Sequence, residues 1–531
     1  MNQRSPAKTR RRGPAPRPER RSPLNATDVT AVPLPPPRRR PDRAELARVA
    51  RFAAVGASGY GVNLGVFAIL VHAGTPATAA AVTSFVAAVA NNYGWNRVWT
   101  FRARGSIAGQ GARFAGVSVA TLVVNLAALH LLLAGGTRAV PAQAAAIVIT
   151  MPLNYLGNRL WTFAPATPGL RDLRAGAYAR ILVWWGLSRT LVFATALVVQ
   201  ALRWPRPGWY VAVHMRPLAL LEAWDGRWYR MVAARGYLAL PHRQSDTAFF
   251  PFYPATVDGV HALGVPLQAA ALLVANAGFV LGLIALYELA RTWLPEKTAE
   301  RTAIYAALFP IGYVFSMEYP EGMVLAAVAG AGAAAARGRW TLAAALGAVA
   351  TLGRPEGVFV ALPLAALALR RDRRPVAFAA AAAPVVALAA VAAYQRRMVG
   401  DPLAFSTAQH AWGRRFELAG VQRAVRELLH AQGQNLWLAR DAAFCGLYVV
   451  LLVVALRAGV PLAWIVAGAL IVLLPLESGS FTSDARFGLL APAAYAGLAV
   501  AGRRRLLDLA LRPAMLCLLG AATATILLRW P

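Results

Sequence analysis

NYGWNRVWTF, at residues 92–101, returns as NYLGNRLWTF at residues 154–163. The same offset of 62 residues relates Arg51-Phe52 to Arg113-Phe114 and Asn63 to Asn125. Agreement of several motifs at one spacing indicates an internal duplication. Each repeat holds two apolar segments, near 52–72 and 77–98 and then near 114–134 and 140–161. We therefore predict a four-helix unit built from two repeats of the same orientation, because each repeat crosses the membrane an even number of times; internal repeats are common in transporters.

The composition extends this prediction to the whole chain. Of 531 residues, 58% are hydrophobic and 15% are charged, which is less charge than a soluble protein carries. Apolar runs of about 17 to 25 residues recur, long enough to cross a hydrocarbon core of roughly 30 Å. Backbone groups in lipid must pair within each span, which favours helices. We expect an all-α polytopic membrane protein.

The net charge of +32 is distributed as a membrane topology requires. Arginine clusters lie in the N-terminal tail and in short segments between spans, and such clusters orient helices by remaining in the cytoplasm. We therefore expect membrane lipids, and no nucleic acid, as partners. Residues 1–47 are rich in Pro and Arg and are predicted to be a disordered cytoplasmic tail. Cys445 and Cys517 lie in apolar runs and indicate neither a disulfide nor a metal site.

The repeated polar residues have two interpretations. Asn and Arg near span ends, beside Trp and Thr, are typical of interfacial anchors. Alternatively they bind the phosphate of a lipid headgroup, since the planar fork of Arg donates two hydrogen bonds. Asn63 and Asn125 lie in mid-span, where polar side chains face a partner or a cavity. The candidates for lipid phosphate are Asn63, Asn96, Arg97, Asn125, Asn158 and Arg159.

Residues 48–165 resemble a GtrA-like domain. The resemblance rests on the Asn-Arg-x-Trp-Thr-Phe ending, which occurs at 96–101 and again at 158–163. It implies a four-span unit that moves polyprenyl-phosphate-linked sugars across a bacterial inner membrane.

After a linker at 166–177, residues 178–531 predict a second bundle of about eleven helices. Starting with the tail in the cytoplasm, the basic clusters return to the cytoplasmic face, whereas the long loops 203–261 and 395–440 fall outside. The segment 340–353 is short, and a re-entrant helix is the alternative there. The expected spans lie near 178–202, 262–289, 302–317, 321–336, 340–353, 356–369, 376–394, 441–456, 459–475, 487–501 and 509–528.

Several loops of this second region combine carboxylates, arginines and aromatic residues. The richest reads LEAWDGRWY at residues 221–229 and is followed by AFFPFYP at 248–254. By the predicted topology all of these loops reach one membrane face, so we expect them to form one site. The others are 313–321, 353–357, 400–415 and 483–487.

Such residues suit transfer of a sugar from a lipid phosphate. An acceptor hydroxyl is a weak nucleophile that needs a carboxylate base, and arginines stabilise the departing phosphate. Direct displacement with one base inverts the anomeric carbon. We assign Asp225 as the base, with Asp246 as second candidate. The substrate-binding candidates are Trp224, Arg227, Trp228, Tyr229, Asp246, Phe250, Tyr253, Glu318, Glu321, Arg354, Gln409, Trp412 and Arg486.

Each assignment has a structural alternative. Asp225 is also suited to cap a helix, since Asp is a favoured N-cap residue. Glu318 and Glu321 are equally suited to ion pairs with nearby arginines. Arg354 and Arg486, near span ends, are equally suited to anchoring.

Residues 178–531 resemble the PIG-V-like mannosyltransferases, which are GT-C glycosyltransferases. The resemblance rests on Trp224-Asp225-Gly226-x-Trp228-Tyr229, Gly236-Tyr237, Phe249-Phe250-Pro251-x-Tyr253-Pro254, the 315–321 segment, Arg354-Pro355-x-Gly357 and the 401–412 loop. It implies Asp225 as the catalytic residue, in an extracytoplasmic loop, and a polyprenyl-phosphate mannose or a close relative as donor. With the GtrA-like unit, it implies a bacterial plasma membrane and cell-envelope synthesis.

The acceptor stays open among glycan, lipid and protein. The histidines His214, His242 and His410 have no metal-ligand spacing, so no metal site is assigned, and a divalent cation held by carboxylates and phosphate stays an alternative. Two other functions also stay open: a lipid-linked sugar transporter without transferase activity, and a membrane scaffold.

Overall fold

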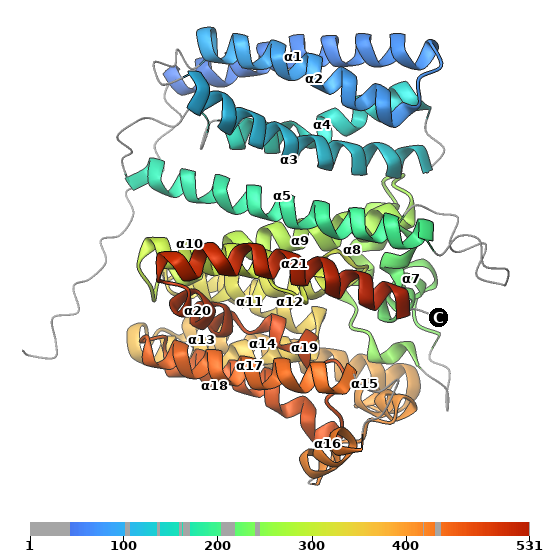
Figure 1. The fold of residues 1–531 in the computed structure, drawn as a ribbon. Coiled ribbons are helices and arrows are strands. Elements are labelled where there is room, and N and C mark those ends of the chain that lie inside the picture. Colours follow the sequence, from blue (N-terminus) through green and yellow to red (C-terminus); the bar gives the residue numbers. More distant parts are fainter. Residues whose placement is uncertain are drawn as a thin grey trace, which may run out of the picture. The chain divides into compact units, whose positions relative to one another are not determined.

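The computed structural model describes residues 43–100, 107–134, 138–158, 162, 170–202, 218–238, 245–417, 419–430 and 437–529. The chain divides into two units, residues 1–49 and 50–531. Of the first, the structure describes residues 43–49, the beginning of a helix, and all that follows concerns the second. Within the described ranges every regular element is a helix (Figure 1). The predicted all-α class is confirmed for this part of the chain.

The duplicated region forms four helices at the predicted positions. They are α1 (Arg43–His72), α2 (Ala77–Trp95), α3 (Ile107–Ala134) and α4 (Ala139–Gly157), and a π-helical turn, Asn96–Thr100, continues α2. One buried cluster of this region contains Phe67 and its counterpart Leu129, and Ala80 and its counterpart Ala142. Because corresponding positions of the two repeats are buried together, the duplication in sequence is also a duplication in packing.

The second region begins with a long helix, α5 (Leu170–Leu202), which already includes the last residues of the predicted linker. The helices of this region after α5 follow most of the predicted apolar segments, and several further ones lie in the segments predicted as loops, 203–261, 395–440 and 483–487. They are α7 (Asp225–Arg235), α8 (Phe252–His261), α9 (Leu267–Ala290), α10 (Glu296–Leu308), α11 (Glu321–Ala335), α12 (Trp340–Gly353), α13 (Ala361–Arg371), α14 (Pro375–Val399), α15 (Ala404–Thr407), α16 (Gly420–Leu429), α17 (Trp437–Arg457), α18 (Leu462–Leu473), α19 (Asp484–Phe487), α20 (Pro492–Ala501) and α21 (Arg505–Arg529). Short 3-10 turns connect several of them, among them Ala219–Glu222, Gly312–Ser316 and Ala408–Trp412.

Helices α9 and α11 cross at very short range because both carry glycine at the contact. Gly278 and Gly282 of α9 are spaced four apart, and a Cβ at Gly278 would lie 2.8 Å from the backbone nitrogen of Met323. A Cβ at Gly322 of α11 would lie 2.7 Å from the carbonyl oxygen of Ala275. Small residues at this spacing let helix backbones touch in a membrane.

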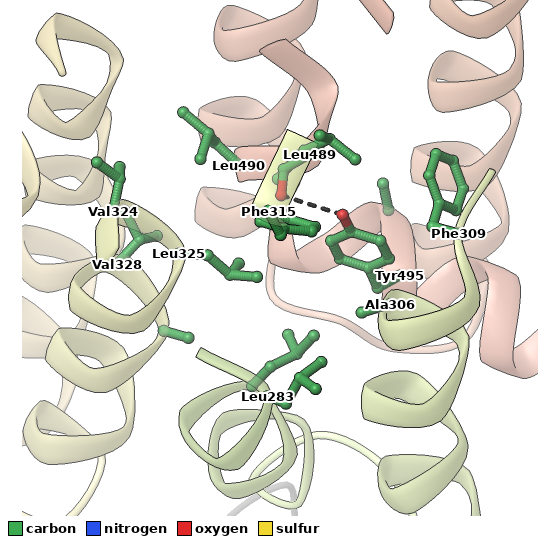
Figure 2. Close-up of a cluster of buried hydrophobic side chains, with 14 of the residues drawn as sticks. Leu283, Ala306, Phe309, Phe315, Val324, Leu325, Val328, Leu489, Leu490 and Tyr495 are labelled. Carbon is green, nitrogen blue, oxygen red and sulfur yellow. Dashed lines mark hydrogen bonds between the residues drawn. The ribbon is translucent and has the colours of Figure 1, made fainter. Parts of the chain in front are cut away.

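The buried core of this region joins segments distant in sequence (Figure 2). Phe279 and Phe315 stack with ring centroids 4.0 Å apart. Tyr495 donates its hydroxyl proton to the carbonyl oxygen of Leu489 at 3.2 Å (Figure 2). The tyrosine hydroxyl is thus paired inside an apolar cluster, as a buried polar group must be.

The predicted span 302–317 is wrong as one continuous helix. Helix α10 ends at Leu308, and Phe309 has extended ψ, because the residue before a proline avoids the helical region and Pro310 has no N–H to donate. Buried Arg189 of α5 compensates for the break. It donates to the carbonyl oxygens of Gly312 at 2.7 Å and Ala307 at 3.3 Å. A side chain thereby supplies donors that the broken helix lacks.

Six stretches within the described helices are long and apolar enough to cross a membrane: 54–72, 176–200, 267–290, 375–399, 437–457 and 505–528. Shorter apolar helices lie at 321–335, 340–353, 462–478 and 492–501. The protein is a multi-pass membrane protein. The total of about fifteen spans and the sidedness of the loops stay predictions.

Candidate active site

A cavity of about 1480 Å³ lies where several of the predicted loops meet; we call it the large cavity. Four of the polar segments singled out in the sequence contribute to its lining, as do the beginning of α17 and the end of α21. The lining residues include Trp224, Asp225, Arg227, Trp228, Arg230, Tyr313, Tyr319, Trp412, Arg414, Trp437, Arg440, Asp441, Ser483 and Arg486. Carboxylates, arginines and aromatic rings from segments 261 residues apart in sequence therefore share one space.

Asp225 is the first residue of α7, and the preceding Trp224 has φ of 61° and ψ of −120°. A positive φ is unfavourable for a bulky residue and tends to occur at functional sites. The backbone N–H of Asp225 donates to the Tyr319 hydroxyl at 3.2 Å, and that hydroxyl donates to the carbonyl oxygen of Ala223 at 3.0 Å. The N-cap position belongs to Trp224, so the structure does not place Asp225 as the helix cap.

Arg486 of α19 is the direct partner of Asp225. Its Nη1 donates to Asp225 Oδ2 at 2.6 Å, and its Nε lies 3.3 Å from Glu321 Oε1. Burial by itself raises the pKa of Asp225, but the charge and hydrogen bond of Arg486, with further help from Arg354 and Arg414, outweigh burial and lower the pKa. Asp225 is consequently ionised at neutral pH.

The two predicted glutamates lie behind the large cavity and are fully buried. Glu318 Oε1 lies 3.6 Å from Nη1 of Arg230, which also forms an ion pair with Glu222. Glu321 forms ion pairs with Arg354 and Arg486. Both glutamates therefore form the ion pairs with nearby arginines that were the alternative to a direct role in substrate binding. Arg354, which also binds Glu356 at 3.0 Å, likewise supports the site from behind.

The predicted aromatic residues divide into two groups. Trp224, Trp228 and Trp412 line the large cavity; the Trp228 ring lies 6.0 Å from that of Trp412. Tyr229 and Tyr253 pack edge to face behind them, with centroids 5.4 Å apart. Flat apolar faces with polar rims suit the C–H faces and hydroxyls of a sugar.

Three further predicted residues lie outside the cavity lining among the described residues. Asp246 Oδ2 accepts from the backbone N–H of Leu238 at 2.5 Å, a contact that holds the loop. Phe250 packs against Phe405 at 5.4 Å. The Gln409 carbonyl accepts from the backbone N–H of Arg414. These positions support the loops, and Asp246 is in a poor position to act as the base.

Sequence reasoning assigned no role to several lining residues, of which Arg414 is the most informative. Its Nη2 donates to the Thr482 carbonyl at 3.1 Å and the Ser483 hydroxyl at 3.3 Å, and no carboxylate of the described residues forms an ion pair with it. Burial and the nearby Arg486 lower the pKa of Arg414, which indicates crowded positive charge. The residue stands in the loop 400–415, but nothing in that loop's sequence shows that it approaches residues 482–486.

A second unusual carboxyl group lies beside the cavity. Ser483 has φ of 73°, and its N–H donates to Asp441 Oδ2 at 2.8 Å. The next residue, Asp484, is fully buried, and neither of its carboxylate oxygens has a hydrogen-bond partner among the described residues. Burial, reinforced by the charge of Asp441, raises the pKa of Asp484 to about 8. Asp484 therefore carries a proton at neutral pH.

The candidates in the four-helix unit are only partly assembled. The amide of Gln143 donates to Asn63 Oδ1 at 3.0 Å and to Asn125 Oδ1 at 3.3 Å. Asn96 and Asn158 are buried, and Arg97 is partly buried. Arg159 lies outside the described residues. The two mid-span asparagines thus meet through one glutamine that sequence reasoning did not identify.

In the part of the chain that the structure describes, no three His, Cys, Asp or Glu side chains gather in a way that could hold a metal ion.

The fold defines a multi-pass helical membrane protein with a duplicated four-helix unit. Comparison with known families assigns that unit: residues 51–163 match the GtrA/DPMS transmembrane domain. The first predicted resemblance is confirmed over this range, and the rest of the chain has no family assignment.

Two curated proteins are similar over about the length of the four-helix unit. The uncharacterized membrane protein YngA of Bacillus subtilis is 28% identical over 129 residues, which is 24% of this chain and 87% of YngA. A dolichol-phosphate mannosyltransferase of Pyrococcus furiosus is 33% identical over 122 residues, 23% of this chain. The match spans 35% of that enzyme. No solved structure matches the chain.

Proposed function

We propose that this protein is an integral-membrane glycosyltransferase of the inverting type. It moves a hexose, mannose in the first instance, from a polyprenyl-phosphate donor to an acceptor, and the GtrA-like unit delivers or translocates the lipid-linked sugar. The observation that carries the proposal is the Asp225–Arg486 pair, set in a cavity lined by further arginines and by tryptophan rings. The PIG-V-like resemblance of residues 178–531 agrees with this assignment.

The charges of the large cavity favour an anionic ligand. Its described lining includes six arginines and two aspartates: Arg227, Arg230, Arg235, Arg414, Arg440 and Arg486, with Asp225 and Asp441. Arg486 is engaged by Asp225 and Glu321, whereas Arg414 binds only neutral oxygens among the described residues. Arg414 is therefore the proposed anchor for the donor phosphate, to which a guanidinium donates two hydrogen bonds.

The proposed step is a direct displacement. Asp225 takes the proton of the acceptor hydroxyl while the oxygen of that hydroxyl attacks the anomeric carbon of the donor sugar. The bond from that carbon to the phosphate oxygen breaks, and the electron pair leaves with the polyprenyl phosphate, whose charge Arg414 and Arg486 stabilise. One base and no covalent intermediate give inversion at the anomeric carbon.

The cavity also has room for an amphipathic donor. Its volume of about 1480 Å³ exceeds the roughly 300–1,000 Å³ of common small-molecule sites. The polar groups lie beside apolar lining from Leu267 and from Ile526 of α21. A sugar phosphate fits the charged part, and the first isoprene units fit the apolar part.

The relatives support the class of substrate. One relative is named a dolichol-phosphate mannosyltransferase, and GtrA-like domains are associated with polyprenyl-linked sugars. Joining such a unit to a transferase on one chain would raise the effective concentration of donor at the cavity.

The test is sugar transfer by the purified protein in liposomes that contain polyprenyl-phosphate mannose. Asp225→Asn should lower the transfer rate by about 10²–10⁴-fold, the usual contribution of a general base. The matched control is Asp258→Asn, an exposed carboxylate on α8, which should retain the wild-type rate. Full activity of Asp225→Asn would reject the assigned base, and movement of the lipid-linked sugar without any product would favour the transporter alternative.

A further inference from the structure

The four-helix unit encloses a second, small cavity of about 60 Å³, which we call the repeat cavity. Twelve of its sixteen described lining residues form six pairs separated by 62 positions, so both repeats present the same face to it. The pairs are Gly56 with Ser118, Gly59 with Thr121, Asn63 with Asn125, Phe85 with Ile147, Ala88 with Thr150, and Asn92 with Asn154. The cavity therefore lies between the two repeats, where internal repeats of membrane proteins place substrate sites.

The lining is polar without being charged. Five of the six pairs contribute at least one Asn, Ser or Thr side chain, and Tyr60 and Asn96 add to these. None of the described lining residues is Asp, Glu, Lys or Arg. Polar side chains within membrane helices are costly and mark functional positions. A phosphate here would be a buried anion without a counter-charge, which is strongly unfavourable, whereas hydroxyl groups would be satisfied.

Two unpaired acceptors show that the polar network is incomplete. Asn96 lines the cavity and is 2% exposed, and its Oδ1 has no hydrogen-bond partner among the described residues. Outside the lining, Oε1 of fully buried Gln143, whose amide holds Asn63 and Asn125 together, also has no hydrogen-bond partner among the described residues. Native proteins rarely leave such atoms unpaired, so we expect a ligand or water to donate to them.

We propose that the repeat cavity is a binding site for the hydroxyl groups of an uncharged polyol headgroup and excludes phosphate. The inference deepens the delivery role in the proposed function and rests on it for the source of the headgroup. It also replaces the expectation that Asn63 and Asn125 bind lipid phosphate.

The volume sets how much of a headgroup the site takes. A space of 60 Å³ holds about four water molecules at roughly 15 Å³ each. That is enough for one hydroxymethyl arm or two neighbouring ring hydroxyls, and too little for a whole hexose. The site thus binds one edge of a sugar, while the phosphate that links the sugar to the lipid stays outside the cavity.

The test uses the full-length protein in lipid nanodiscs, in an Arg414→Gln/Arg486→Gln background that weakens anion binding in the large cavity. Equilibrium binding is measured for a radiolabelled short-chain alkyl mannoside, the matching alkyl phosphate, and free mannose. Asn125→Leu should weaken mannoside binding about tenfold, as expected for loss of one or two buried hydrogen bonds, and should leave alkyl-phosphate binding unchanged. Thr150→Val, which is isosteric, should weaken mannoside binding in the same direction without disturbing the packing.

The control is Thr83→Val, an exposed threonine of α2 whose hydroxyl bonds only to its own helix among the described residues, and it should bind all three probes as the background does. Unchanged mannoside binding in both Asn125→Leu and Thr150→Val would overturn the inference, as would an equal loss of alkyl-phosphate binding. If free mannose bound as tightly as the mannoside, the result would support the site and would show that its ligand is a soluble polyol and not a lipid headgroup. The same substitutions are also made in the chain that keeps Arg414 and Arg486, and sugar transfer is measured. If mannoside binding were unchanged by the substitutions while that chain transferred sugar normally, the inference about the repeat cavity would be overturned and the proposed transferase function would stand.

Discussion

Asp225 is ionised but restrained in the structure, because the same guanidinium that lowers its pKa also occupies Oδ2. A carboxylate with a lowered pKa is a weaker base. A donor phosphate that drew Arg486 toward itself would relieve both effects. In the proposed mechanism, the ion pair would therefore link arrival of the donor to the strength of the base.

Substitution of Arg486 by Gln tests this link. The neutral side chain removes the main cause that lowers the pKa of Asp225, so burial dominates and the pKa rises. The acid limb of the kcat/KM profile should move to higher pH, and kcat/KM at its optimum should fall by about 10–10³-fold through lost stabilisation of the phosphate. Arg426→Gln, an exposed arginine of α16, should leave the limb in place. An acid limb that does not move would contradict the pairing.

Asp484 predicts a pH dependence of stability. Its pKa rises from an ordinary 3.8 to about 8 in the folded protein, so between these values the folded chain keeps a proton that the unfolded chain has lost. The free energy of unfolding should therefore fall as pH rises through this window, by up to about 1.4 kcal/mol per pH unit. Asp484→Asn should remove this part of the slope in thermal melts of the detergent-solubilised protein. An unchanged slope would show that Asp484 is ionised throughout.

Part of the site could be predicted from residue chemistry. Asp225, Trp228 and Arg486 stand in loops between apolar segments. Charged and aromatic residues in such loops differ from the apolar sequence around them and can therefore be chosen as candidates. Arg414 and Asp484 could not be assigned in this way, because their importance comes from a contact and from a missing partner. Asp246 was the second candidate for the base, and the fold turns its carboxylate toward the backbone N–H of Leu238.

At the scale of elements, hydropathy predicted the helices well and their interruptions poorly. The segment 302–317 is apolar throughout, so it reads as one span, although Pro310 stops α10 within it. The break is stable because Arg189 comes from α5, 123 residues away in sequence. No local pattern reveals a donor at that distance. The break matters to the site, because the segment that follows it carries Tyr319 and Glu318.

The crossing of α9 and α11 supports the segment that follows Pro310. The glycines at this crossing give a testable prediction. Gly278→Ala should lower the free energy of unfolding by about 1–3 kcal/mol, the usual cost of overpacking, because its Cβ would meet the backbone of Met323. The matched control is Gly446→Ala in α17, where an added Cβ meets nothing within 4 Å. That change should be neutral or stabilising by up to about 1 kcal/mol. Equal effects of the two changes in denaturant unfolding would contradict the close crossing.

The whole molecule combines two cavities of opposite character. The repeat cavity is small and, in its described lining, uncharged, while the large cavity is rich in arginine. A lipid-linked sugar has one part for each, since its hydroxyls are neutral and its phosphate is anionic. The sequence predicted the two regions but not this division, because the lining residues of each cavity come from separate helices and assemble only in the fold.

The division predicts that delivery and transfer can be lost independently in the intact chain. In liposomes that carry the mannosyl donor in a single leaflet, the double change Asn63→Leu/Asn125→Leu should slow product formation about tenfold or more when the donor starts in the leaflet away from the large cavity. The same variant should act at the wild-type rate when the donor starts beside that cavity, because Asp225 and Arg414 are untouched. Asp225→Asn should fail from both leaflets. If the double variant lost activity equally from both, the four-helix unit would be a structural support of the transferase, and its polar cavity would have no part in moving the sugar.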